Sequence, residues 1–309
     1  MEGGSSGYYY PANWNIVKDW RGELPFSPIS LQYYTGQCWN FSIQECVRDI
    51  AYLEKHPLKE DISASEMRDW LPFLSSFFDM KAKPPAHSVN QYVWPPYDIG
   101  NGFGATVPEI FQYLKCFGTF FKSDYLYEQP LLGNNFTPFS MEQFHALRTT
   151  APERIFIDTY RILEAEKAIP IIKTKHPAVG GLFSNYDNFV RYNYNRSLSP
   201  IKPVDTSGKS HCPDHMVYIV GYGFDKGKRI GDQDEDDDDM DIGDEDEGTE
   251  CFLIKNTWKS WGYEGYGMVP VKLFEHVAYP KGVNVRDSST IINNDFHVAE
   301  AQRKYYGRF

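Results

Sequence analysis

Cys38 is the residue of this sequence best suited to nucleophilic chemistry. A cysteine attacks as its thiolate, and its surroundings decide how much thiolate is present. Cys38 follows Gly36 and Gln37, and the apolar residues after it recur every three or four positions, which predicts a helix over 38–55. In the first turn of that helix, unpaired N–H groups and the helix dipole would favour a negative charge. A histidine and a third, orienting group would complete a nucleophilic site.

Two later segments contain these groups. His215 lies in the segment DHMVYIVGYG (214–223), and Asn256 lies in LIKNTW (253–258). Cys38 itself lies in QYYTGQCWNFS (32–42). The three segments, in this order, resemble the papain family of cysteine peptidases, the C1 or cathepsin type. Weaker similarity extends over about residues 14–270, beginning near Asp19-Trp20-Arg21.

The resemblance implies a catalytic triad. Cys38 would attack the scissile carbonyl, His215 would share its proton and later protonate the leaving amine, and Asn256 would hold the imidazole through its side-chain oxygen. The side-chain amide of Gln32 and the backbone N–H of Cys38 would form the oxyanion hole. Three residues would have supporting roles. Trp258 would shield the Asn–His bond, Trp39 lies beside the nucleophile, and Asp214 is an acidic neighbour of the histidine. No metal or cofactor would be required.

The resemblance also implies how a substrate would be held. Gly102 and Gly104 would pair with the substrate backbone, although Phe103 interrupts the Gly-Gly pair usual in the family. Met216 would line an apolar pocket for the residue that precedes the one cleaved. The implied function is a cysteine-type endopeptidase that works through an acyl-enzyme. Its partners would be a peptide or protein substrate and, as a further candidate, a proteinaceous inhibitor.

Three alternatives remain open on the sequence alone. An exopeptidase of the same fold needs an element that blocks one end of the cleft and captures a terminal charge, and the sequence offers no paired histidine motif for this. A papain-like binding protein without turnover is the second alternative. Acyl transfer, as in transglutaminase-like enzymes, is the third, and the contexts of Gln32 and Asn256 do not favour it.

The expected elements indicate an α+β chain with a papain-like two-lobed fold. Helices are expected over 38–55 and 108–117, and strands over 177–183, 216–222, 252–258 and 267–271. We expect a helical lobe over about 14–125, a strand-rich lobe with a barrel-like antiparallel sheet over about 126–285, and the active-site cleft between them. A flexible arm (1–13), an acidic insertion (226–250) and a C-terminal tail (286–309) would complete the chain.

The negative charge is concentrated in one place. Residues 232–250 contain thirteen acidic residues and no Lys or Arg, and without them the formal net charge of −11 becomes +2. Such a block repels itself and is typical of a solvated insertion. No basic stripe appears elsewhere, which argues against nucleic acid as a partner. No apolar run approaches the roughly 20 residues of a membrane span, so no membrane partner is expected.

The cysteines indicate a reducing compartment. The five are Cys38, Cys46, Cys116, Cys212 and Cys251, and Thr35 stands where the family usually has a disulfide-bonded cysteine. If His215 lay opposite Asn256 in paired strands, Cys212 would face Lys259 and Cys251 would face Val220, so neither would be bridged. Without a visible secretion signal, we expect a cytoplasmic or other reducing location. Since about a dozen residues precede the mature-like start, we also expect no inhibitory pro-segment.

Overall fold

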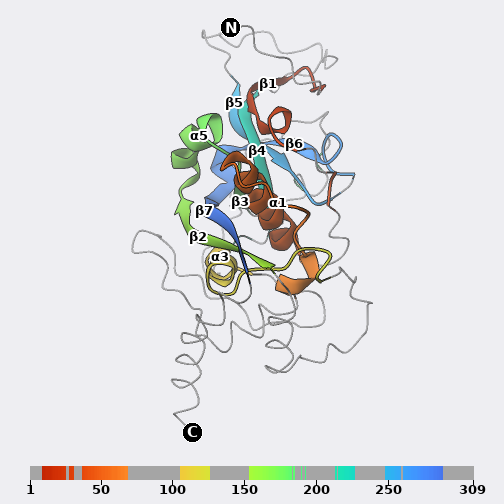
Figure 1. Ribbon diagram of the computed structural model, residues 1–309. Helices are drawn as coiled ribbons and strands as arrows, with labels where there is room; N and C mark the ends of the chain where they lie inside the picture. Colours follow the sequence, from red (N-terminus) through yellow and green to blue (C-terminus); the bar gives the residue numbers. More distant parts are fainter. Residues whose placement is uncertain are drawn as a thin grey trace, which may run out of the picture. The chain divides into compact units, whose positions relative to one another are not determined.

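The computed structural model in Figure 1 describes residues 9–25, 28–30, 37–68, 105–125, 153–182, 184, 189, 192, 213, 215–226, 248–258 and 260–287. The chain forms two compact units. The first consists of Met1–Leu31 and Leu163–Val277, and the second of Gln32–Ile162 and Ala278–Phe309. In the part of the chain that is described, no helix is long and apolar enough to cross a membrane.

Helix α1 (Cys38–Leu53) in the second unit confirms the predicted helix and its first residue. Its apolar residues Trp39, Ile43, Cys46 and Ile50 are buried, as their spacing predicted. The helix ends two residues earlier than predicted. The N–H of Glu54 still bonds to the carbonyl of Ile50, but Lys55 adopts a positive φ of 68°, which a right-handed helix cannot continue.

Helix α3 (Val107–Cys116) in the same unit confirms the second predicted helix. Thr106 and Glu109 form a capping box, in which each side chain accepts the backbone N–H of the other residue. Gly118 follows the helix at φ 65°, and a Cβ there would lie 2.8 Å from the ring of Phe156. A glycine is therefore required where the chain turns toward the next element.

The first unit is built around strand β4 (His215–Asp225), which is buried along nearly its whole length. Strand β5 (Thr249–Lys255) pairs antiparallel with it on one side, and β6 (Tyr266–Pro270) pairs with β5. On the other side, β3 (Ala178–Leu182) pairs with the first half of β4 and β1 (Trp14–Asp19) with the second half. Figure 1 shows β4 between these neighbours, with helix α5 (Ala165–Thr174) beside them.

The sheet is open, which corrects the barrel-like sheet expected from the sequence. Its strand order is β2-β7-β3-β4-β5-β6, with β1 attached to β4. Strands β2 (Glu153–Leu163) and β6 stand at the two ends of this order and do not pair with each other, so the sheet does not close. Strand β7 (Phe274–Asp287) begins in the first unit and continues in the second. A short 3-10 turn follows β1 at Trp20–Gly22, and another precedes β7 at Val271–Leu273. The α+β class is confirmed.

The pairing of β4 with β5 differs from the expected register. Ile219 lies opposite Ile254, and a bulge after Ile219 shifts the pairing further, so Cys251 lies opposite Gly223 and not Val220. The glycines of β4 explain how β1 fits against it. A Cβ on Gly223 would lie 2.3 Å from the carbonyl oxygen of Asn15 in β1. The described cysteines Cys38, Cys46, Cys116 and Cys251 form no disulfide, as expected, while Cys212 lies outside the described residues.

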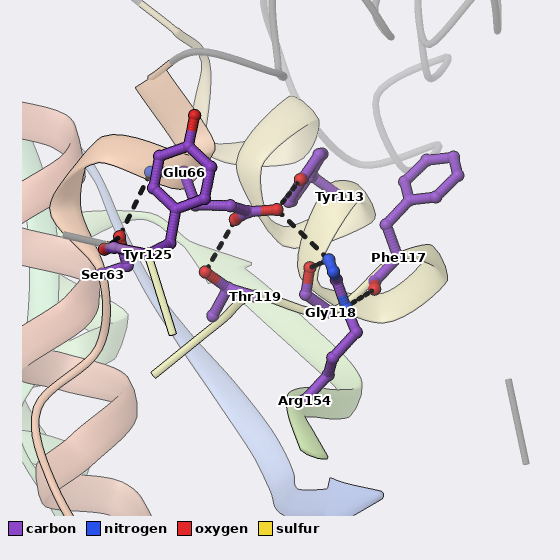
Figure 2. Close-up of polar contacts among 8 residues, drawn as sticks. All are labelled: Ser63, Glu66, Tyr113, Phe117, Gly118, Thr119, Tyr125 and Arg154. Atoms are coloured by element: carbon purple, nitrogen blue, oxygen red, sulfur yellow. Dashed lines mark hydrogen bonds and ion pairs between the residues drawn. The ribbon is translucent and has the colours of Figure 1, made fainter. Parts of the chain in front are cut away.

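A buried ion pair organises the second unit (Figure 2). Arg154 of β2 and Glu66, in a helical turn over 64–68, have fully buried side chains whose charged groups lie 3.2 Å apart. Arg154 also donates to the carbonyl oxygens of Phe117 and Gly118, at 2.9 and 2.7 Å, just beyond the C-terminus of α3. Glu66 accepts from two hydroxyls, those of Tyr113 and Thr119. The pair therefore joins β2, α3 and the turn over 64–68.

Candidate active site

Cys38 is the first residue of α1, where the sequence placed it. Its side chain is 7% exposed and takes part in no disulfide. The N–H groups in the first turn of a helix have no partner within the helix, and the positive end of the helix dipole lies there. The second unit thus places the Cys38 thiol at the positive end of the dipole of α1.

His215 and Asn256 are hydrogen-bonded in the first unit. His215 begins β4, and Asn256 directly follows β5, the strand paired with it. The Nε2 atom of His215 lies 2.9 Å from Oδ1 of Asn256, and both side chains are buried. The adjacent antiparallel strands therefore place together two residues that are 41 positions apart in the sequence.

The surroundings of Asn256 determine which nitrogen of His215 carries a proton. The backbone N–H of Thr257 donates to Oδ1 of Asn256 at 2.8 Å, so this atom is the acceptor oxygen of the amide. The Nε2 atom of His215 must then be the donor, and Nδ1 is the nitrogen that can exchange a proton elsewhere. Asn256 is held in turn by its own backbone N–H, which donates to the carbonyl of Gly265 at 2.8 Å.

Aromatic rings cover this hydrogen bond. Trp258 stacks on the imidazole of His215, with ring centroids 4.6 Å apart and planes 28° apart. Phe189 packs edge-on against both rings, at 5.7 Å from each. Phe189 is itself held by Trp261, whose indole N–H donates to the Phe189 carbonyl oxygen at 2.6 Å. Trp258 and Phe189 thus both pack on the imidazole of His215, and the shielding role of Trp258 stays a prediction.

The remaining predicted site residues are only partly described. Trp39 is buried in α1, 2% exposed, and packs in the interior of the second unit. Met216 is buried in β4 and lies opposite Gly181 of β3. Four predicted residues lie outside the described residues: Gln32, Asp214, Gly102 and Gly104. Within the described part of the chain, no group of three or more His, Cys, Asp or Glu side chains could hold a metal ion.

Two features of this region were not predicted. The first is the packing of Phe189 on His215, because an aromatic residue seven positions after the end of β3 gives little signal by itself. The second feature is a set of buried amides on α1, Gln37, Asn40 and Gln44. Their spacing of three and four positions was a visible sign that one face of the helix is polar but not exposed.

The family of the chain follows from a comparison with protein-family models. The model described as papain family cysteine protease matches residues 104–275, more than half of the chain. The chain belongs to the papain family of cysteine proteases. The matched range contains His215 and Asn256 and starts after Cys38. The assignment of Cys38 therefore depends on its own sequence context and its position in α1.

Solved structures of papain-family proteins share the fold. A procathepsin L2 proteinase from the larval midgut of Tenebrio molitor is similar with a TM-score of 0.52 and 18% identity, over 89% of this chain and 69% of that chain. A structure from work on the mite allergens Blo t 1 and Der p 1 has a TM-score of 0.54 and 18% identity, over 91% of this chain and 74% of that chain. At this identity the likeness concerns the fold alone. None of the curated proteins compared with the chain matches it.

Proposed function

We propose that this papain-family chain is an active cysteine-type endopeptidase with Cys38, His215 and Asn256 as its catalytic triad. The observation that carries the proposal is the shielded hydrogen bond from Nε2 of His215 to Asn256, which leaves Nδ1 for proton transfer. A histidine held in one tautomer by a third group is the arrangement that a nucleophile's base requires. The start of α1 at Cys38 supports the nucleophile assignment.

In the proposed reaction, the Cys38 thiolate attacks the carbonyl carbon of the scissile peptide bond, and the carbonyl π electrons move to oxygen. The oxyanion is stabilised by the backbone N–H of Cys38 and the side-chain amide of Gln32. When the intermediate collapses, protonated His215 gives its proton to the leaving amine, and a thioester to Cys38 remains. Neutral His215 then takes a proton from water, which attacks the thioester, and the acid product and the Cys38 thiolate are released.

The proposal specifies cleavage within chains. An exopeptidase would need an element that captures a terminal amine or carboxylate, and the sequence lacks a paired histidine element for that purpose. We further propose that Met216, buried and next to His215, contributes to a preference for apolar side chains at the position before the cleaved residue.

A thiol-directed epoxide tests the proposal directly. The pure protein is titrated with the epoxide, and the labelled peptide is mapped by mass spectrometry. We expect one equivalent on Cys38, loss of peptide hydrolysis in step with labelling, and no hydrolysis by the Cys38→Ser variant. The products of an unlabelled peptide of about twelve residues then separate internal cuts from end-trimming.

Three results distinguish the alternatives. Stepwise removal of residues from one end would replace the endopeptidase by an exopeptidase. A folded protein that neither labels at Cys38 nor hydrolyses any peptide would favour a papain-like binding protein. Because Cys116 is exposed, labelling there alone with retained hydrolysis would place the nucleophile elsewhere. The Cys116→Ser variant serves as the control for this reaction.

A further inference from the structure

Three buried amide side chains form a line along one face of α1. Gln37 is the residue before Cys38, and Asn40 and Gln44 follow at intervals of three and four positions. Their exposed fractions are 1%, 0% and 9%. Side chains at this spacing lie above one another on a helix, so the line runs along α1 and ends at Gln37, the residue before Cys38.

Two backbone carbonyls fix the orientation of the second and third amides. Gln44 donates from Nε2 to the carbonyl oxygen of Ser63 at 3.0 Å, and Asn40 donates from Nδ2 to that of Ala64. A carbonyl oxygen can only accept, so these atoms must be the amide nitrogens. Gln44 also donates from Nε2 to Oδ1 of Asn40 at 2.5 Å, which agrees with that assignment.

The first amide is left with an unused donor. Nδ2 of Asn40 donates to Oε1 of Gln37 at 3.4 Å, so the oxygen of Gln37 faces Asn40. The Nε2 atom of Gln37 is buried and has no hydrogen-bond partner among the described residues. Gln37 is the N-cap residue of α1, but its side chain does not cap the helix. A buried amide N–H without an acceptor is unfavourable, so an acceptor in the working enzyme would explain its presence.

The three amides are polarised in the same direction. Two of them donate toward the N-terminus of α1, Gln44 to Asn40 and Asn40 to Gln37. Hydrogen-bonded amides in such a chain polarise one another, and the donor at its end gains positive character. This end coincides with the positive end of the dipole of α1. Cys38 directly follows Gln37 in the sequence and is the first residue of the helix.

We propose that Gln37 is a positioning residue for the nucleophile, whose unused N–H, polarised by Asn40 and Gln44, stabilises the negative charge of the Cys38 thiolate. This inference rests on the proposed function, in which Cys38 acts as a thiolate. It adds a side-chain dipole to the effect of the helix itself. The negative charge that Gln37 would stabilise forms when the Cys38 proton passes to His215, so no further reactant is needed.

The test compares two glutamine-to-methionine variants in the full chain. Gln37→Met keeps the length of the side chain and removes the unused N–H. Gln44→Met makes the same replacement at the other end of the line, where the nitrogen is bonded to Ser63 and Asn40. The rate at which iodoacetamide alkylates Cys38 is followed against pH, with the Cys38 peptide quantified by mass spectrometry. The midpoint gives the pKa of the thiol, and melting temperatures report stability.

We expect Gln37→Met to raise the Cys38 pKa by about one unit, and to shift the acidic limb of the kcat/KM profile upward by the same amount. Gln44→Met should lower the melting temperature and shift the Cys38 pKa by less than about a third of a unit. Equal shifts in both variants, or no shift in Gln37→Met, would overturn the inference while the proposed function stands. A wild-type Cys38 that titrates as an ordinary thiol, with no turnover, would overturn both.

Discussion

The Oδ1 atom of Asn256 accepts two hydrogen bonds, from Nε2 of His215 at 2.9 Å and from the N–H of Thr257 at 2.8 Å. The backbone therefore fixes the amide, and the amide fixes the imidazole. Because the second bond comes from the residue adjacent to Asn256, the amide orientation does not depend on any distant loop. The tautomer of His215 is therefore set by the two residues directly after β5.

Loss of the Asn256 side chain should reduce turnover more than binding. Asn256→Ala removes the acceptor that holds the His215 ring, and misplaced catalytic groups typically lower rates by about 10²-fold. We expect kcat to fall by about that factor with KM changed less than about twofold. Steady-state kinetics on a peptide substrate measure both quantities. An unchanged kcat in a folded Asn256→Ala protein would remove Asn256 from the proposed triad.

The indole of Trp258 should contribute through its ring rather than through its N–H. Trp258 stacks on His215 with centroids 4.6 Å apart, so Trp258→Ala exposes the His–Asn hydrogen bond to water. Aromatic pairs contribute about 1 kcal/mol beyond their buried area, and we expect kcat/KM to fall about tenfold. Trp258→Phe keeps an aromatic cover and should retain most activity. If the two variants lose activity equally, shielding by the ring is not the role of Trp258.

Breaking the buried ion pair of Figure 2 should cost much more stability than replacing it. Arg154→Met leaves Glu66 buried without its charged partner and should lower the free energy of unfolding by about 3–5 kcal/mol. The double variant Arg154→Met with Glu66→Leu removes both charges and should recover most of that loss. Urea denaturation measures both. If the double variant lost as much stability as the two single substitutions together, the two charges would not interact.

The pH dependence of stability should contain a contribution from His276. Its Nε2 atom is buried without a hydrogen-bond partner in the described chain, and its ring packs against Gly181, where a Cβ would lie 2.6 Å from Cε1. Burial lowers the pKa of His276 from 6.5 to about 4, opposed by the neighbouring charge of Glu275. Between these values the unfolded chain binds a proton that the folded chain does not. The free energy of unfolding therefore falls as pH falls through this window.

The expected size of the His276 effect is about 3 kcal/mol between pH 7 and pH 4. His276→Leu cannot bind a proton, so its free energy of unfolding should fall less over the same interval. Denaturation of both proteins at several pH values gives the difference, which cancels the contribution of the carboxylates that both share. If the free energies of unfolding of the two proteins changed equally with pH, His276 would not be protonated more readily in the unfolded chain.

Helices α1 and α3 and four of the strands could be predicted because their patterns are local, whereas α5, β1 and β2 were not predicted. The apolar spacing in α1 and the capping residues before α3 act within a few positions of the chain. Strand β7 was not predicted, since Pro280 and Gly282 interrupt its pattern. A long-range contact accounts for part of it. The N–H groups of Gly282 and Val283 donate to the carboxylate of Glu54, at 3.0 and 2.9 Å, which no local pattern reveals.

The register of β4 and β5 could not be predicted for a different reason. A strand with one buried face alternates apolar and polar residues, and the alternation fixes its register. Strand β4 is buried on both faces, so its sequence permits several registers. The identities of Cys38, His215 and Asn256 were predictable from residue type and order. The orientation of the Asn256 amide was not, because it depends on the backbone after β5.

The candidate catalytic histidine and the acidic stretch lie at opposite ends of β4. His215 begins the strand, whereas Asp225 ends it and pairs with Thr249, the first residue of β5. The points where the acidic stretch leaves and rejoins the sheet are thus neighbours, roughly 33 Å along the strand from His215 at about 3.3 Å per residue. Since a longer connection between neighbouring points costs little extra entropy, the length of this stretch can change without moving the imidazole.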